Sequence, residues 1–196
     1  MEALTVPPAC AVALKEWASV LEAMSRGEQL VLIRKGGLIE PGSGFELLSP
    51  QFVFYPTFEH QTANYVRPEC QPSLEQALRR RAPEGQVRIE LFGMAVATTQ
   101  TRDAQIIERI SSFHIYNDAF VSQRLKWQPD QPLVIVIVRV FRLAAPCTLD
   151  VIPRYAGCKS WVDLDSSVPL EGVRPALDDA TFRERMQAVS ALLPAP

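Results

Sequence analysis

Two adjacent cations followed by two glycines form the first pattern that could bind a ligand. Arg34 and Lys35 end an apolar stretch, and Gly36 and Gly37 follow them. Glycines let the backbone approach an anion closely and point its N–H groups at it. The segment therefore predicts an anion site, and a tight turn with two solvated charges is the alternative explanation.

A histidine beside an amide forms the second pattern. His60 and Gln61 follow Pro56-Thr57. If Thr57 caps a helix, His60 lies in the first turn, where the helix dipole favours neutral imidazole. Neutral imidazole can act as a general base, so His60 is the candidate catalytic residue and both side chains are candidate ligand contacts. The alternative is that Thr57 and His60 only satisfy backbone groups at the helix start.

A single arginine interrupts the most apolar segment of the chain. Arg139 follows the uninterrupted apolar run at residues 133–138. A buried guanidinium needs a carboxylate, a phosphate or carbonyl groups as partners. Arg139 is therefore a candidate ligand contact, and an internal salt bridge is the alternative.

The last pattern is Gly157-Cys158-Lys159-Ser160-Trp161. Lys159 and Ser160 could hold a phosphate or a base, and Trp161 could stack on a flat ring. The alternative is a turn whose tryptophan packs in the core.

Motifs for metals and common cofactors are missing from the sequence. It contains no P-loop, no dinucleotide-binding glycine pattern, no nucleophile elbow and no His-Glu-x-x-His. The two histidines and four widely spaced cysteines do not match zinc-site spacing. We therefore expect neither a metal nor a cofactor.

Length and composition indicate an ordinary globular chain. Its 196 residues are 47% hydrophobic and 21% charged, which fits one domain over residues 1–196 with frayed ends at 1–8 and 194–196. A net charge of −2 predicts only modest, salt-sensitive affinity for nucleic acid. No stretch is long enough to span a membrane, and the start lacks the basic region of a signal peptide. We therefore expect a soluble cytoplasmic protein without a membrane partner.

Periodicity and turn residues place these patterns on an α+β fold. We expect a single domain with a mixed sheet or partly closed barrel of about five strands and flanking helices. Capping residues and helical spacing predict helices from just after Pro8 to Gly27 and over residues 57–66, 73–81, 101–109, 118–125 and 179–192. Alternation and apolar runs predict strands over residues 29–34, 45–55, 87–98, 113–116 and 133–143.

The motif order resembles that of a bacterial family of uncharacterised proteins, a domain of unknown function. The shared segments are Leu-Lys-Glu-Trp at 14–17, Arg-Lys-Gly-Gly at 34–37, Pro-Thr-x-x-His-Gln at 56–61 and Gly-Cys-Lys-Ser-Trp at 157–161. The resemblance covers residues 14–164 and brings no activity with it. The order of a helix over 17–26, Gly27 and a strand ending in Arg34 is also similar to PUA-like modules of the ASCH and EVE type, which are linked to RNA or modified bases.

Three functions are consistent with these patterns. The first is a binding module for a nucleotide, base or RNA segment that uses a basic and aromatic cleft. The second is an accessory or scaffold protein without a small-molecule site, and the third is a metal-independent enzyme with His60 as general base. The sequence identifies no protein partner and no oligomeric state.

Overall fold

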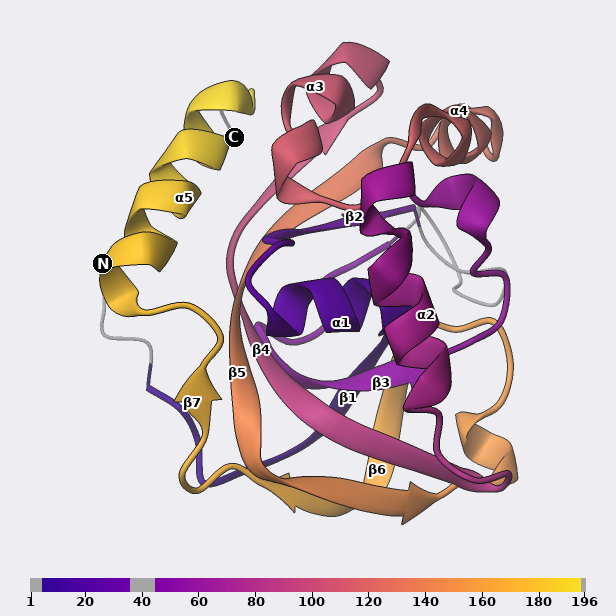
Figure 1. The fold of residues 1–196 in the computed structure, drawn as a ribbon, viewed down its shortest axis with the longest axis vertical. Helices are drawn as coiled ribbons and strands as arrows, with labels where there is room; N and C mark the ends of the chain where they lie inside the picture. The colour runs from indigo at the N-terminus through magenta and orange to yellow at the C-terminus, as the bar shows by residue number, and fades with distance from the viewer. Residues whose placement is uncertain (1–4, 36–44, 195–196) are drawn as a thin grey trace.

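The chain forms one mixed sheet with helices packed around it (Figure 1). A computed structural model describes residues 5–35 and 45–194. Its strands are β1 (Ala9–Trp17), β2 (Val31–Arg34), β3 (Gln51–Thr57), β4 (Gln86–Thr101), β5 (Leu133–Asp150), β6 (Trp161–Pro169) and β7 (Arg174–Pro175). The predicted α+β class with a mixed sheet is confirmed, with seven strands in the described residues instead of about five.

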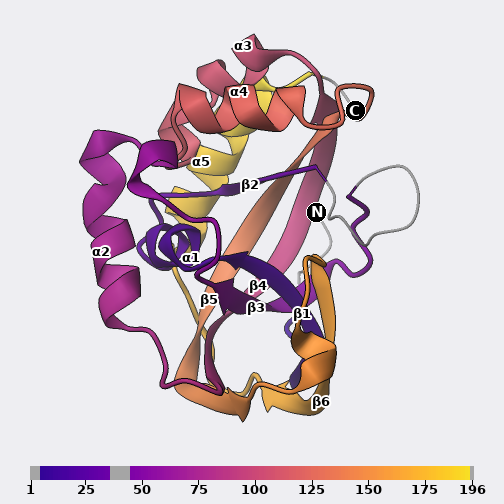
Figure 2. The same ribbon diagram turned by 90° about the vertical axis from the view of Figure 1, so that its right-hand side faces the viewer.

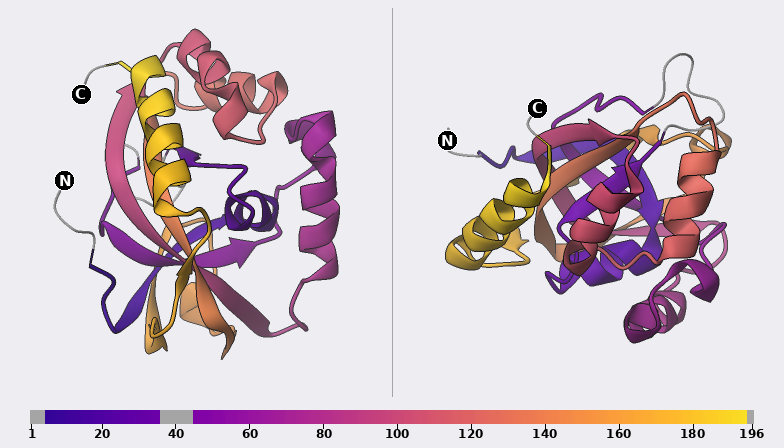
Figure 3. Two further views of the ribbon diagram at one scale, coloured as in Figure 1. Left: turned by 60° about the vertical axis from the view of Figure 1, so that its left-hand side comes forward. Right: turned by 90° about the horizontal axis from the view of Figure 1, so that it is seen from above.

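The helices lie around the edges and over one face of the sheet (Figures 1 and 3). The α-helices are α1 (Ala18–Ser25), α2 (Gln71–Arg79), α3 (Ala104–Arg109), α4 (Asp118–Lys126) and α5 (Asp179–Leu192). Short 3₁₀ helices are η1 (Ala63–Tyr65), η2 (Pro68–Cys70), η3 (Ser111–Phe113) and η4 (Pro153–Tyr155). None of the helices in the described part of the chain has both the length and the apolar character needed to cross a bilayer.

The sheet curves because its two longest strands are irregular. Its order is β2-β5-β4-β3-β1-β6, and β7 pairs with β5. The antiparallel β4–β5 ladder shifts register between Ile89 and Leu91 and between Ala95 and Ala97. Such bulges bend strands, and the sheet wraps around α1 (Figures 1 and 2).

Strand β1 lies between β3 and β6 and separates two apolar clusters. It pairs parallel with β3 and antiparallel with β6, which places residues 9–14 beside residues 161–169. Leu14 belongs to the larger cluster with α1, whereas Ala13 belongs to the smaller one. Because strand side chains alternate between faces, Lys15 lies on the same face of β1 as Ala13, and Glu16 lies on the same face as Leu14.

Three predicted elements are wrong. The first predicted helix is strand β1 followed by α1, because pairing with β3 and β6 overrides the helical spacing. The segment 57–66 is the end of β3 and the short helix η1, and 113–116 is η3 with a single bridge at Tyr116. The last predicted helix matches α5, whose N-cap Asp178 accepts hydrogen bonds from the N–H groups of Ala180 and Thr181 at 2.9 Å.

Candidate functional site

Residues from the four motifs at 14–17, 34–37, 56–61 and 157–161 meet in one cluster around the Arg34 side chain. The Arg34 guanidinium donates to a Glu16 carboxylate oxygen at 2.9 Å and to the Lys15 carbonyl at 3.1 Å. It also donates to the Ser160 hydroxyl at 2.8 Å. Thr57 adds a fourth segment, because its hydroxyl donates to the Glu16 carbonyl at 3.2 Å. We call Lys15, Glu16, Arg34, Thr57 and Ser160 the motif cluster.

Glu16 joins the motif cluster to the start of α1. It is 5% exposed and accepts the Trp17 N–H at 2.7 Å in addition to the Arg34 bond. Helix α1 has no side-chain cap at Trp17, so the carboxylate supplies an acceptor at the strand-to-helix junction. A buried carboxylate requires such partners.

His60 lies on an exposed bend instead of in a helical turn. Because Thr57 ends β3, the expected helix cap is not formed, and His60 has a positive φ of 61°. Gln61 faces inward: its side-chain oxygen accepts the Ser19 N–H of α1 at 3.2 Å. The Gln61 amide nitrogen and the Ser19 hydroxyl are buried without a hydrogen-bond partner in the described residues.

The side chains of the motif at 157–161 point in different directions. Ser160 is 3% exposed in the motif cluster, and its carbonyl accepts the Lys15 N–H at 2.8 Å. Trp161 is half-buried and stacks on Phe45 with centroids 6.0 Å apart. The Phe45 ring lies 5.2 Å from the Arg34 guanidinium, so Trp161 reaches the cluster through that ring. The Lys159 ammonium donates instead to the Arg154 carbonyl.

Arg139 contacts α5 on the outside of β5. Its guanidinium pairs with Asp179 at 2.5 Å and lies 4.4 Å from the Phe182 ring centroid. These contacts attach α5 to the sheet (Figure 3). Gly36 and Gly37 lie outside the described residues.

A cavity of about 700 Å³ lies on the Lys15 side of β1. Helices α1 and α2, the end of β3, parts of β4 and β5, and η4 surround it. We call it the large cavity. Lys15, Pro56, Thr57 and Gly157 line it, so three of the four motifs contribute to its wall.

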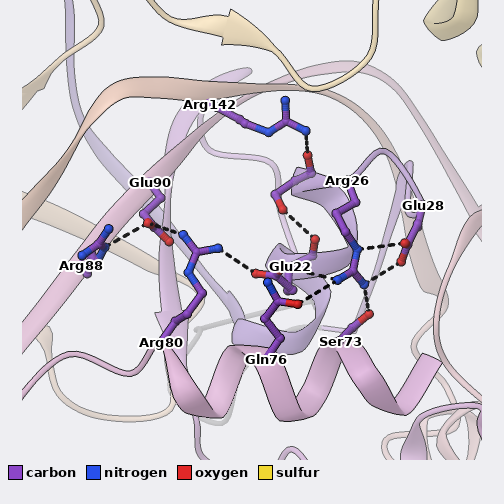
Figure 4. Close-up of polar contacts among 10 residues, drawn as sticks. Glu22, Arg26, Glu28, Ser73, Gln76, Arg80, Arg88, Glu90 and Arg142 are labelled. Atoms are coloured by element: carbon purple, nitrogen blue, oxygen red, sulfur yellow. Dashed lines mark hydrogen bonds and ion pairs between the residues drawn. The ribbon is translucent and has the colours of Figure 1, made fainter.

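Charged side chains connect α2 to α1 and β4 along one wall of the large cavity (Figure 4). The Glu22 carboxylate, whose side chain is 8% exposed, pairs with Arg80 at 3.1 Å and Arg26 at 3.4 Å. Arg80 also pairs with Glu90 at 2.8 Å, and Glu90 holds Arg88 at 2.9 Å. This network fixes the position of α2 and thus the width of the cavity.

Three cations of the large cavity have no carboxylate partner among the described residues. Lys15 donates to the Gly157 carbonyl at 3.0 Å, and Arg142 donates to the Ser25 carbonyl. Arg81 lies 4.9 Å from the Phe58 ring centroid. Burial, and then the charge of Lys159, lowers the pKa of Lys15. The same wall holds Tyr55, whose pKa burial raises.

A second hollow of about 50 Å³ lies on the Glu16 side of β1. We call it the small pocket. Its polar lining consists of Glu16, Arg34, Lys35, Tyr116 and Arg124, and its apolar lining of Trp17, Ile33 and Phe120. The motif cluster therefore separates two hollows with different linings.

Sequence reasoning missed four polar residues at these hollows. Lys15 and Glu16 were visible only as parts of the Leu-Lys-Glu-Trp motif at 14–17, and alternation along β1 would have placed them on opposite faces. Tyr116 and Arg124 come from segments without a motif. Arg124 lies in the last turn of a helix, where a cation is favourable for local reasons. Within the described ranges, no three His, Cys, Asp or Glu residues come together as a metal site.

Comparisons with known proteins give a family and two distant structures. An ASCH protein from Zymomonas mobilis is 11% identical, with 90% of this chain and 93% of that chain covered and a TM-score of 0.40. A mutant form of ASCH from the same organism is 12% identical, with 93% and 99% covered and a TM-score of 0.42. No curated protein matches the chain. The family model described as a domain of unknown function, DUF1802, matches residues 13–188, and the chain therefore belongs to that family.

Proposed function

We propose that the protein is a binding module for a nucleotide, base or RNA segment, and that the ligand lies in the large cavity. The observation that supports this proposal is the lining of a cavity of about 700 Å³ by aromatic rings together with cations that form no ion pair among the described residues. Small-molecule sites in proteins have volumes of roughly 300–1,000 Å³, so one nucleotide fits.

The aromatic side chains offer stacking surfaces for bases. Tyr55, Phe58 and Tyr155 line the large cavity, and the Arg81 guanidinium covers the Phe58 ring. Aromatic rings and guanidinium planes both stack on nucleobases without strong sequence preference. A single-stranded segment with unstacked bases is therefore a better match than a duplex.

The cations supply contacts for phosphate groups. Lys15, Arg81 and Arg142 line the wall without a carboxylate partner in the described part of the chain, while Glu59 and Glu84 can accept hydrogen bonds from base amino groups. Because the wall carries both signs of charge, the proposal predicts modest affinity that falls as salt rises.

Fluorescence anisotropy with a labelled single-stranded RNA of about ten nucleotides tests the proposal. We expect Arg81→Glu to weaken binding at least tenfold, and Phe58→Ala to weaken it by roughly tenfold because a stacked base loses its platform. Arg109→Glu, at an exposed position of α3, is the matched control and should bind like the original chain.

The salt dependence provides the second readout. Raising salt from 50 to 200 mM should weaken binding to the original chain more than binding to Arg81→Glu, since the variant makes fewer phosphate contacts. Equal affinities and equal salt dependence for the original chain, Arg81→Glu and Phe58→Ala would contradict the proposal.

A further inference from the structure

The small pocket contains more positive charge than its carboxylate balances. Glu16 is its one carboxylate within the described residues, and it pairs with Arg34. Lys35 and Arg124 line the same pocket and form no ion pair with any described residue. The described lining of the pocket therefore carries three positive charges and one negative charge.

These two cations are held by groups that carry no full charge. The Lys35 ammonium, in a side chain that is only 1% exposed, donates to the Leu125 carbonyl at 3.1 Å near the end of α4. Arg124 lies 5.2 Å from the Phe120 ring centroid. A carbonyl and a ring face attract a cation, but they leave its charge largely uncompensated.

The charges also disfavour one another. Burial, followed by the charges of Arg102 and Arg124, lowers the pKa of Lys35. Burial and then the charge of Arg34 lower the pKa of Arg124. Each cation is thus less stable than in water, and an anion between them would remove this cost.

We propose that the small pocket is a phosphate-binding site formed by Arg34, Lys35 and Arg124. Its volume of about 50 Å³ limits the ligand to a small group such as a phosphate. Arginine guanidinium groups match phosphate oxygens in pairs, and a lysine adds a point charge. The half-buried Arg124 lies at the edge of the pocket, where an anion can reach it from solvent.

The site is independent of the proposed nucleotide site. Lys15 and Glu16 point to opposite faces of β1, so the large cavity and the small pocket lie on different sides of that strand. The phosphate site does not need the large cavity to be occupied. Failure of one proposal therefore leaves the other open to its own test.

Thermal unfolding of the full chain in chloride and in inorganic phosphate at equal ionic strength tests the phosphate site. The variant is Arg124→Gln, and Lys126→Gln is the matched control, since it removes an exposed charge from the same helix. In chloride we expect Arg124→Gln to be at least as stable as the original chain because the variant removes a repulsive charge. At phosphate near 100 times its Kd, the original chain and Lys126→Gln should gain roughly 5 °C more than Arg124→Gln.

The opposite pattern would overturn the proposal. If Arg124 serves only to pack on Phe120, Arg124→Gln will be less stable in both salts, and phosphate will stabilise every chain equally. That equal gain would be the general stabilising effect of phosphate on folded proteins.

Nucleotide probes distinguish free phosphate from a phosphate carried by a nucleotide. A nucleoside 5′-monophosphate, the corresponding nucleoside and inorganic phosphate are compared by calorimetric titration of the original chain, Arg124→Gln and Arg81→Glu. Loss of inorganic phosphate binding in Arg124→Gln alone identifies a site for the free ion. Loss of monophosphate binding in that variant, with no inorganic phosphate bound by any chain, shows that the ligand of the site is the phosphate group of a nucleotide. Retention of all binding in Arg124→Gln would contradict the proposed site.

Discussion

Glu16 is the residue on which both the junction of β1 with α1 and the charge balance of the small pocket depend. Its carboxylate holds the Trp17 N–H and the Arg34 guanidinium in a buried position. Removing one partner of a buried ion pair leaves an uncompensated charge, which costs several kcal/mol. The residue is therefore more important for folding than its place in a short motif indicates.

We predict that Glu16→Gln lowers the free energy of unfolding by about 3–5 kcal/mol, because Arg34 then loses its carboxylate partner in a pocket that also holds Lys35 and Arg124. Urea denaturation measures this change. Adding Arg124→Gln should restore part of the loss, since it removes one of the unbalanced cations. A loss below about 1 kcal/mol would mean that water already screens the pocket charges.

At the scale of elements, helix α2 is connected to α1 partly through charged and polar side chains. Its buried residues are few: Ser73, Leu74 and Ala77. Glu22 of α1 contacts Arg80 at the end of α2, and Arg26 contacts Glu22 and Ser73 (Figure 4). The buried Glu22 carboxylate thus joins α1 to the end of α2 at one wall of the large cavity.

We predict that Glu22→Ala destabilises the protein by about 2–4 kcal/mol and loosens α2, because Arg26 and Arg80 lose their shared partner. Amide hydrogen exchange along α2 and urea denaturation measure the two effects. Arg79→Ala is the control: its partner Glu75 is 68% exposed, so its loss should cost less than about 1 kcal/mol. Similar exchange rates in both variants would show that α2 is held by other contacts.

The elements also show how far sequence reasoning can go. The helix α5 and the strands β4 and β5 were predictable because their caps, alternation and apolar runs are local signals. Strand β1 was not, because the alanines of residues 9–14 favour a helix and the segment takes strand geometry only through pairing with distant β3 and β6. In β6 the alternation of buried Val162 and Leu164 with exposed Asp163 is a local strand signal, and none of the predicted strands includes it.

Convergence of the motif residues is a property of the whole molecule, and the sequence could not establish it. Arg34 and Ser160 are 126 positions apart and meet only because β1 pairs with β6 beside the end of β2. Arg139 lies on the outside of the sheet against α5, and no local signal distinguished it from an inward-facing arginine. The motifs supplied the candidate residues, and the topology of the sheet determines which of them are neighbours.

A buried histidine couples the stability of the whole molecule to pH. The His114 ring is 2% exposed; Nδ1 accepts the Tyr116 N–H at 3.2 Å, so the proton lies on Nε2 and points to the Ile107 carbonyl. Burial, more than any other influence, lowers the His114 pKa from 6.5 to about 4. As the pH falls, His114 is therefore protonated near pH 6.5 in the unfolded chain but only near pH 4 in the folded chain.

We predict that this histidine removes about 2 kcal/mol of stability between pH 7 and pH 5, because protons bind more strongly to the unfolded chain in this range. The stabilisation is complete above pH 6.5 and is lost as the pH falls toward 4. Urea denaturation at both pH values for the original chain and for His114→Gln measures the difference. If both chains lose the same stability, His114 is not responsible for the pH dependence.

The pairing of β1 with β6 has a consequence for the order in which a growing chain can fold. Protein synthesis delivers Glu16 and Arg34 before Ser160 and the β6 strand that pairs with β1. A nascent chain that stops before residue 161 has β1 exposed along one side, which is a surface that other extended chains can join. The pairing of β1 with β6 and the contact between Arg34 and Ser160 can therefore form only after residues 160–169 have been synthesised.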